Sequence, residues 1–371
     1  NTLMWRYRKI SSSFYYRLKW FSQVNHPQLE NQKNFQKIIF IFLNFIKVIK
    51  FRIFIQFFGN KIIFKLFKKF YMDIIKPNND LRKYINKIKP DLILVPSQAQ
   101  CSMDNDLIKL SKSKNIKTLF LIDNWDNLSD KSVMWNKPDY IGVWGEQTKR
   151  HAIKIQKFNK NKISTIGTPR FENYFIKREK KLPSHFKFEY ILFLGTALIF
   201  DENKILRILD NFFLKYKKLT SNLKIVYRPH PWRMSKEKIN IKKYKNVIID
   251  PQVKHIYLNK TNPNKSMKFQ PDLNYYASLI KNSKFVVGGL TSMLIESSIF
   301  YKHYIVTALK EKQFNNQYNS LKYMVHFKEL NKLKNVLISK TSEEIKKNLL
   351  YCFYKDNKIN KHLTNEKRKF F

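Results

Sequence analysis

Short apolar segments alternate with helical patterns from residue 81 onward, and this alternation constrains the fold more than any other feature of the chain. The segments are rich in β-branched and aromatic residues, as strands of a sheet are; they are 92–95, 118–122, 140–144, 163–166, 190–194, 223–227, 247–249, 285–287 and 303–306. Helical patterns separate them, for example at 147–157 and 202–216. Because strands that alternate with helices form βαβ units, the sequence predicts an α/β fold with parallel sheets.

A charged segment at 177–187 divides this alternation into two halves. The segment contains Pro183 and has no apolar periodicity, which is typical of a linker between domains. We therefore predict two Rossmann-like domains whose parallel sheets face a cleft. The predicted parts are a basic, aromatic helical region at 1–80, an amino-terminal domain at 81–180, a carboxyl-terminal domain at 188–345 and a Lys-rich helical tail at 346–371.

The chain is strongly basic, with 72 Lys and Arg against 27 Asp and Glu and a formal net charge of +45. Such a charge favours anionic partners, among them nucleic acids, acidic membranes and nucleotide-linked substrates. The charge is diffuse, and the sequence has no zinc-finger spacing, RNP pattern or helix-turn-helix signature, so we do not expect nucleic acid as a partner. The two cysteines, Cys101 and Cys352, fit a reducing compartment, and we expect a cytoplasmic protein.

The amino-terminal region is both basic and apolar. Residues 1–72 contain one acidic residue, Glu30, and the segment 38–70 is dense in Ile and Phe. Its longest charge-free run, 38–46, is too short for a spanning helix, which needs roughly 20 apolar residues. We predict two or three basic amphipathic helices, which either lie on an anionic membrane surface or pack their apolar faces onto the domain core.

One functional motif follows the apolar run 223–226, where Tyr227 leads into Arg228-Pro229-His230-Pro231. Ligands of open α/β sheets bind at the carboxyl ends of strands, so a motif at this place is a candidate site. Arg228 offers a planar fork of donors for a phosphate, and His230 can donate to a phosphate or sugar oxygen or act as an acid. The alternative interpretation is a strand-end turn with a capping histidine.

A second motif, Gly288 to Glu296, follows the apolar run 285–287 and opens a helix. Gly288 and Gly289 would let the backbone approach a ligand, and Thr291 and Ser292 can cap the helix and donate to a phosphate. Glu296 could accept hydrogen bonds from ribose hydroxyls. The alternative is an ordinary capping pattern.

The cluster Asp123-Asn124-Trp125-Asp126-Asn127 ends a predicted strand in the first half. Carboxylates, amides and an indole suit a sugar or polyol, which takes planar hydrogen bonds and one apolar contact. Either Asp123 or Asp126 could deprotonate an acceptor hydroxyl, and Asn124 and Trp125 would bind the acceptor. An Asx-rich turn is the alternative interpretation.

Weaker candidates complete the predicted site. Gly195 and Thr196 end the first strand of the second half and look like a donor-side loop, whereas Glu146 and Arg170 would contact the acceptor. Arg170 could instead be an ordinary surface residue. The remaining histidines show no metal-ligand spacing, and we predict no metal site; they are His26, His151, His185, His255, His303, His326 and His362.

These segments resemble the GT-B transferases of bacterial surface polysaccharide synthesis. The segments 228–231, 272–283 and 288–296 are similar to the carboxyl half of the CDP-glycerol glycerophosphotransferase-like group, with its related capsule and Kdo-type transferases. The pattern from 123–129 to 167–170 looks like members of the same broad group. The resemblance covers roughly residues 90 to 310 and implies a GT-B fold.

The resemblance also implies a function. The second domain would hold a donor nucleotide through Arg228, His230, Thr291, Ser292 and Glu296, without a bound metal or cofactor, and the first domain would hold the acceptor. Glycerophosphotransferases tend to carry an acidic residue and Ser-Ser where this chain has Gly-Gly-Leu, which favours glycosyl transfer. We predict a glycosyltransferase, peripheral to the inner membrane, that moves a sugar from a nucleotide donor to a capsule or lipopolysaccharide acceptor. The alternatives are a polyol-phosphate transferase, a nucleotide-sugar epimerase, and a basic RNA- or membrane-binding protein with a degenerate site.

Overall fold

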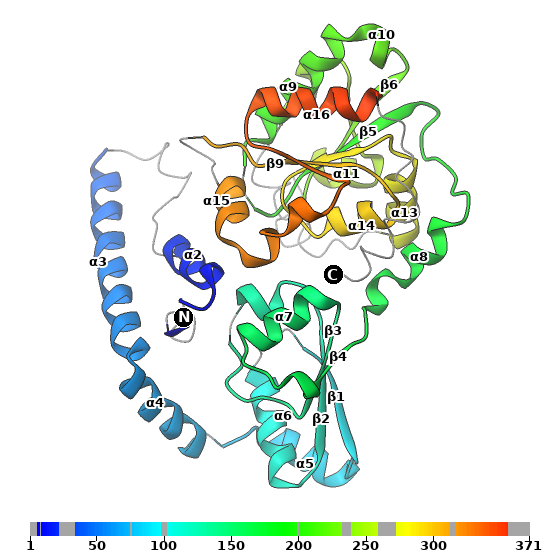
Figure 1. The fold of residues 1–371 in the computed structure, drawn as a ribbon. Helices are drawn as coiled ribbons and strands as arrows, with labels where there is room; N and C mark the ends of the chain where they lie inside the picture. Colours follow the sequence, from blue (N-terminus) through cyan, green and yellow to red (C-terminus); the bar gives the residue numbers. More distant parts are fainter. Residues whose placement is uncertain are drawn as a thin grey trace. The chain divides into compact units, whose positions relative to one another are not determined.

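The computed structural model describes two compact units, each built on a parallel sheet (Figure 1). The described residues are 6–7, 9–21, 34–74, 76–97, 102–131, 133–198, 200–231, 239–258, 272–311 and 316–354. Unit 1 contains the described residues up to Thr168 together with Tyr323–His326, and unit 2 contains Pro169–Lys322 and the described residues from Phe327 onward. The predicted fold class, α/β with two Rossmann-like parallel sheets, is confirmed.

The sheet of unit 1 has four parallel strands in the order β1-β2-β3-β4. Their bounds are β1 Leu92–Ser97, β2 Lys117–Ile122, β3 Tyr140–Val143 and β4 Ile163–Thr165. The helix α5 Asn79–Ile88 precedes β1, and the connecting helices are α6 Ser102–Ser113 and α7 Glu146–Lys154, with short turns η2 Asn127–Lys131 and η3 Lys160–Lys162. Phe120, Ile141 and Val143 are fully buried, so the apolar runs that predicted the strands also supply the core of this unit.

In the described part of the chain, α2 Ser12–Phe21, α3 Asn34–Gly59 and α4 Lys61–Ile74 lie ahead of α5 and of this sheet. The side chain of Asn60 accepts a hydrogen bond from the Ile62 backbone N–H at 2.9 Å, which helps to separate α3 from α4. One side of these helices joins a small core in which Phe14, Ile55 and Phe64 contact one another and Val133. The predicted basic helices are therefore confirmed. Among the described residues, none of the helices has the length and apolar character needed to cross a membrane.

The sheet of unit 2 has six parallel strands in the order β10-β9-β8-β5-β6-β7. Their bounds are β5 Glu189–Leu194, β6 Leu223–Arg228, β7 Val247–Ile249, β8 Val286–Gly288, β9 Tyr304–Thr307 and β10 Val336–Ser339. Numbered along this unit, the order is 3-2-1-4-5-6, that of a doubly wound Rossmann sheet, and it reverses between β5 and β8. Ile191, Leu192 and Phe193 are all fully buried, because a parallel sheet covered on both faces needs continuous apolar strands.

Helices surround this sheet. They are α8 Glu172–Arg178, α9 Glu202–Lys215, α10 Lys217–Thr220, α11 Pro251–Leu258, α13 Leu273–Asn282, α14 Met293–Ile299, α15 Asn316–Tyr323 and α16 Ser342–Tyr354, with short turns η4 Pro169–Phe171, η5 Ile241–Lys243 and η7 Leu330–Lys332. The short turn η6 Val325–Phe327 lies where the chain passes from unit 1 back to unit 2. Because α8 packs against α13 and α14, the chain changes units at Thr168 and not within the predicted linker at 177–187.

The carboxyl-terminal part differs from the sequence interpretation in two respects. Residues 336–339 lie outside the apolar runs that the sequence predicts as strands, but they form β10, which pairs with β9 and extends the sheet. The helix α16 crosses the predicted boundary at 345, and its Ile345, Leu349 and Cys352 are buried in the main core of unit 2. The predicted tail beyond Tyr354 lies outside the described residues.

Candidate functional site

The carboxyl edge of the unit 2 sheet brings together most of the predicted donor residues. Leu194 of β5 pairs with Gly288 of β8 on one side and with Arg228 of β6 on the other. The loop that begins at Gly195 and the loop that begins at Gly289 therefore leave the sheet side by side, where the strand order reverses. This is the place at which open α/β sheets bind ligands.

The two loops are joined by a residue that the sequence interpretation missed, Gln317 of α15. Its Nε2 donates to Thr196 Oγ1 and to the Leu198 carbonyl, both at 3.0 Å, and its Oε1 accepts from the Leu290 N–H at 2.6 Å. A Cβ at Gly289 would lie 2.7 Å from Gln317 Nε2, so glycine makes room for this bridge. No local signal in the sequence marks Gln317, because its partner Thr196 lies 121 residues away.

Gly288 also makes room for a side chain of its own unit. A Cβ at this position would clash with the Tyr304 hydroxyl and lie 3.0 Å from the Leu194 carbonyl oxygen. The Tyr304 hydroxyl in turn donates to the Gly289 carbonyl at 2.8 Å, which fixes the start of the loop. The glycines of this motif thus have a packing role, whatever their role toward a ligand.

Replacing Gly288 by alanine should therefore destabilise unit 2 by about 1–3 kcal/mol, the usual cost of overpacking a core. The second substitution Tyr304→Phe removes the clashing oxygen, so the double variant should lose less stability than the two single variants together. Urea denaturation followed by circular dichroism measures the free energy of unfolding of the two single variants and the double variant. A Gly288→Ala variant as stable as the wild type would show that the Tyr304 ring moves aside without cost.

Arg228 is held inside the unit. Its guanidinium forms an ion pair with Asp250, which follows β7, and donates to Gln252 Oε1 at 2.7 Å, and its Cζ lies 4.7 Å from the centre of the Tyr276 ring. The arginine side chain is 5% exposed and Asp250 is fully buried. The hydroxyl of Tyr275 donates to the same carboxylate. Contact between Arg228 and a phosphate therefore stays a prediction, whereas its structural pairing with Asp250 is observed.

His230, the other residue of that motif, is half-buried just beyond β6. A Cβ at Gly195 would lie 2.9 Å from the His230 backbone nitrogen, so the loops after β5 and β6 pass close together here. The proposed acid role of His230 is neither supported nor contradicted by this geometry. Residues 232–238, which follow it, lie outside the described part of the chain.

Glu296 is the most unusual charged residue of the site. It lies on α14 directly beyond the β8 loop, and only 3% of it is exposed. Tyr174 of α8 donates a hydrogen bond to it, and Arg170 Nη2 lies 3.8 Å from its Oε1. Its Oε2 has no hydrogen-bond partner among the described residues. Burial raises the pKa of Glu296 to about 7, against the lowering effect of Arg170 and Tyr174.

Arg170 pairs with Glu296, a predicted donor residue. We expected Arg170 on the acceptor side, but Pro169 and the residues after it belong to unit 2. Its side chain is 47% exposed while that of Glu296 is 4% exposed, so the pair joins a buried acid to a cation that solvent can reach.

Thr291 and Ser292, the predicted hydroxyl donors, are half-buried at the end of the loop that follows β8.

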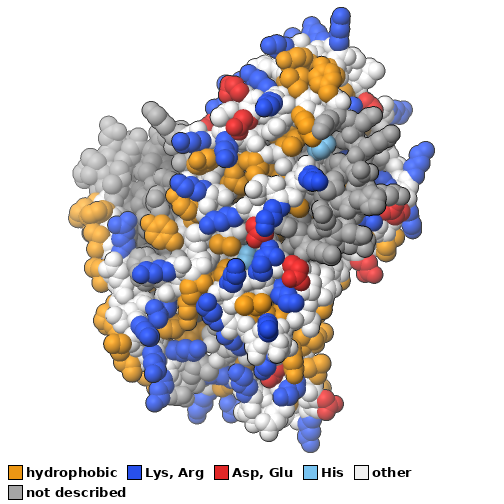
Figure 2. Space-filling view, in the orientation of Figure 1, with side chains coloured by type: hydrophobic (Ala, Val, Ile, Leu, Met, Phe, Trp, Pro, Cys, Tyr) orange, Lys and Arg blue, Asp and Glu red, His pale blue; other side chains and the backbone are white. Residues whose placement is uncertain are grey.

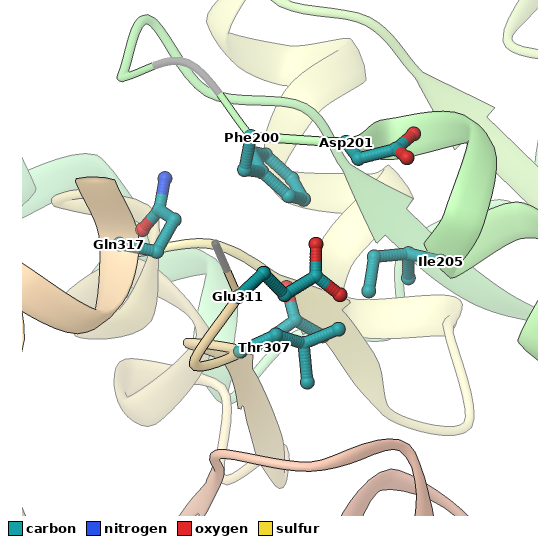
Figure 3. A pocket seen from close by; sticks show the side chains of 7 residues that line it. Phe200, Asp201, Ile205, Thr307, Glu311 and Gln317 are labelled. Carbon is teal, nitrogen blue, oxygen red and sulfur yellow. The ribbon is translucent and has the colours of Figure 1, made fainter. Parts of the chain in front are cut away.

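A small pocket, open to solvent, lies beside the Gln317 bridge (Figure 3). Its lining residues are Phe200, Asp201, Ile205, Thr307, Leu309, Glu311 and Gln317. Figure 3 shows the Glu311 carboxylate near the middle of this group, and Lys204 forms an ion pair with that carboxylate. The pocket has room for about one water molecule. Its polar groups already have partners in the protein, because Thr307 Oγ1 donates to the Gly288 carbonyl at 3.1 Å and Asp201 accepts from the Lys204 N–H at 2.9 Å.

In unit 1, the predicted acceptor cluster lies where expected, directly after β2, but its indole is packed inside. Trp125 is 3% exposed, and its ring lies edge-on to His326 with ring centres 5.0 Å apart. Asp126 is half-buried with Lys131 Nζ 3.4 Å from its Oδ2, and Asp123 is exposed. The Asn124 side chain accepts from the Trp125 N–H at 3.0 Å, as in an Asx-rich loop.

Asp130 is a residue of unit 1 that the sequence interpretation missed. It is 1% exposed, its Oδ2 lies 3.0 Å from Arg17 Nε, and its Oδ1 has no hydrogen-bond partner in the described chain. Burial raises the pKa of Asp130 to about 6, although Arg17 lowers it. In the same unit, burial lowers the pKa of His326, which lies edge-on to Trp125, to about 3, so that this imidazole is neutral at physiological pH.

The remaining candidates are more dispersed. Glu146 is exposed at the first residue of α7, whose start is held by Thr148 Oγ1 accepting from the Gly145 N–H at 2.9 Å. His185 stacks on Tyr275 with ring centres 4.0 Å apart, and His151 and His303 are buried. Over the described ranges, no three His, Cys, Asp or Glu side chains gather in a way that could hold a metal ion. Cys101, His26, His362 and the side chain of His255 lie outside what the structure describes.

Solved structures resemble this chain at low sequence identity, whereas the two other comparisons found no match. No protein-family model matches it, and no curated protein does. Among solved structures, it is similar to UDP-GlcNAc 2-epimerase from Neisseria meningitidis bound to UDP-GlcNAc, with 11% identity, 81% of this chain and 78% of that chain covered, and a TM-score of 0.48.

Two further solved structures are similar at the same low level. For UDP-GlcNAc 2-epimerase from Methanocaldococcus jannaschii, the identity is 12%, the coverage is 75% of this chain and 74% of that chain, and the TM-score is 0.47. For a UDP-forming α,α-trehalose-phosphate synthase from Burkholderia xenovorans, the identity is 7%, the coverage is 78% of this chain and 71% of that chain, and the TM-score is 0.39. The class of fold therefore rests on the two parallel sheets themselves, and the reaction must be argued from the site.

Proposed function

We propose that this chain is a glycosyltransferase of the GT-B type, which binds a nucleotide-activated sugar at the carboxyl edge of unit 2 and transfers the sugar to a glycan or lipid-linked acceptor. Capsule and lipopolysaccharide precursors are the acceptors that the sequence resemblance favours. The donor is itself the activated substrate, and the proposal includes no further cofactor. Such a reaction belongs in the cytoplasm, where nucleotide-activated sugars are available.

The observation that carries the proposal is the buried carboxylate of Glu296. Burying a carboxylate costs free energy unless donors surround it, and here Oε2 has no protein donor among the described residues. A ribose offers two adjacent hydroxyl donors of the required kind. Since α14 begins directly beyond the β8 loop, a ribose bound to Glu296 would leave the attached phosphates near Thr291 and Ser292.

Arg170 completes this arrangement. Its exposed guanidinium lies beside Glu296, and a guanidinium fork binds a diphosphate well. As the bond between the anomeric carbon and the diphosphate breaks, negative charge grows on the leaving phosphate oxygen, and a fixed cation stabilises that charge. In the proposed step, an acceptor hydroxyl attacks the anomeric carbon and passes its proton to a carboxylate. Asp123 and Asp126 stay sequence predictions for that carboxylate.

Nucleotide binding should therefore depend on Glu296. Thermal shift with UDP, CDP, GDP, dTDP and CMP should show one base-specific rise in melting temperature, because a ligand that binds only the folded state stabilises it. Glu296→Ala should lose this response, and the matched control Glu179→Gln, at an exposed carboxylate of the same unit, should keep it. A folded wild-type protein that responds to none of these nucleotides would refute the proposal.

Product analysis with the responding nucleotide sugar then separates the related reactions. Transfer should release the nucleoside diphosphate only when an acceptor glycan is present. Donor that is converted to an isomeric sugar without any acceptor would identify an epimerase, and a phosphodiester in the product would identify a polyol-phosphate transferase. Either result would agree with the proposed donor site but would show that the reaction is not glycosyl transfer.

A further inference from the structure

The outer side of α3 and α4 carries an unusual row of exposed apolar residues. We call this surface the α3–α4 face; its members are Phe42, Phe45, Ile49, Ile53, Phe57, Ile62, Leu66 and Phe70, with exposed fractions between 39% and 70%. On α3 they recur at intervals of three or four residues, and on α4 at intervals of four, so each helix presents them on one side. Contiguous exposed apolar surface of this kind marks an interaction site.

The other side of the same helices already packs against the rest of unit 1. Ile55 and Phe64 are buried there among Phe14 and Val133, and the Phe64 ring lies 5.6 Å from the ring of Trp135. A surface helix of a globular protein normally has one apolar face and one polar face. Among the α3 side chains whose burial the structure describes, Ile55 packs on the core and the apolar row is exposed, so the exposed aromatic residues require a separate explanation.

Charge indicates what covers the α3–α4 face. Exposed basic residues accompany the apolar row along both helices; they are Lys50, Arg52, Lys61, Lys65 and Lys69. Asp73 is the only acidic residue in the sequence between 34 and 74. Figure 2 shows hydrophobic and basic side chains interleaved along the side of the molecule where α3 and α4 lie in Figure 1. The partner must therefore offer an apolar region to the Phe, Ile and Leu side chains and negative charge to the Lys and Arg side chains.

We propose that the α3–α4 face docks onto an anionic phospholipid bilayer, with its Phe, Ile and Leu side chains in the boundary between headgroups and acyl chains and its Lys and Arg side chains among the phosphates. Helices of this composition lie in the plane of the interface. Each basic residue near an anionic surface strengthens the attraction. A second copy of this chain fits less well, because it would bring two basic surfaces together. This surface belongs to unit 1 and does not depend on the donor site proposed for unit 2.

Vesicle flotation of the full chain tests the proposal. We expect binding to phosphatidylcholine vesicles that contain phosphatidylglycerol, weaker binding to pure phosphatidylcholine, and loss of the difference at high salt, where surface charges are screened. Replacing both Phe45 and Phe57 by glutamate should weaken the binding by at least about tenfold, because two buried rings are lost and two like charges face the anionic lipid. Ile176→Glu, at an exposed apolar position of unit 2, is the matched control and should float like the wild type.

A second variant changes charge alone. Lys65→Glu with Lys69→Glu leaves the apolar row intact and should reduce binding to the anionic vesicles while leaving the weak binding to phosphatidylcholine unchanged. The proposal is overturned if the wild type fails to float with anionic vesicles, or if the Phe45 and Phe57 double variant floats as well as the wild type. It is also overturned if light scattering without lipid finds a wild-type dimer that the double variant converts to a monomer, because the face then binds a second copy.

Discussion

Replacing Arg228 by alanine should destabilise the protein by about 3–5 kcal/mol, because the substitution leaves the buried charge of Asp250 without its partner. Arg228 is 5% exposed and Asp250 is fully buried, so water cannot replace the lost ion pair. The sequence alone suggests a different result, in which Arg228 binds only the donor phosphate, so that Arg228→Ala cuts turnover by orders of magnitude and leaves folding intact. Urea denaturation followed by circular dichroism distinguishes the two expectations, and Arg207→Ala, at an exposed arginine of the same unit, is the control.

The partner variant makes this prediction specific. Asp250→Asn removes the stranded charge and keeps the shape, so adding it to Arg228→Ala should recover part of the lost stability. The Tyr275 hydroxyl can still donate to the amide oxygen in that double variant. An Arg228→Ala protein whose unfolding midpoint matches the wild type would show that the ion pair contributes nothing to stability. Any loss of activity in Arg228→Ala must therefore be measured where the variant remains folded.

The strands of both sheets could be predicted from the sequence because their signal is local. A buried parallel strand is a short continuous apolar run, and Tyr190 to Leu194 or Leu223 to Tyr227 can be recognised without knowing their neighbours. β10 was missed although its run, Val336 to Ile338, follows a Lys-Asn pair as the predicted run 247–249 does and has the same length. Its strand character comes from pairing with β9, which is a long-range property.

The places of the Arg228 and Gly288 motifs in the fold could be predicted from the sequence, but the contacts of their side chains could not. The motifs at Arg228 and Gly288 lie at the carboxyl ends of strands, as their sequence context indicated. Which side chains meet there depends on the order of the strands, which a single sequence does not reveal. β7 lies beside β6, and so Asp250 reaches Arg228. The bridge from Gln317 to Thr196 depends in the same way on a contact across 121 residues.

Replacing Glu296 by glutamine should raise the stability of the protein at pH 8 by up to about 3 kcal/mol, because the wild type must bury a charged carboxylate there. Burial raises the pKa of Glu296 in the folded state to about 7 from an ordinary value of 4.5. Between these two pH values the unfolded chain has lost the proton and the folded chain still holds it, so wild-type stability falls as the pH rises. Glutamine does not titrate, so the variant should lack the part of this fall that comes from Glu296 and keep the part that comes from Asp130, whose pKa burial raises to about 6.

Unfolding free energies of both proteins from pH 4 to pH 8.5 measure this effect. The two curves should lie close together near pH 4 and separate progressively up to about pH 7. A constant difference across the whole range would contradict the raised pKa and would mean that water or another group already satisfies Oε2. Glu179→Gln, which changes an exposed carboxylate, should follow the wild-type curve throughout.

The same variants connect stability with function. A carboxylate that destabilises the folded state is expected to persist where it is needed for binding, since activity and stability often oppose each other at functional sites. If Glu296 binds the ribose of a donor, Glu296→Gln should gain stability at pH 8 and should also respond less to the nucleotide that stabilises the wild type. If stability rises while the nucleotide response is unchanged, Glu296 is a strained residue outside the donor site. That result would remove the main support for the proposed transferase.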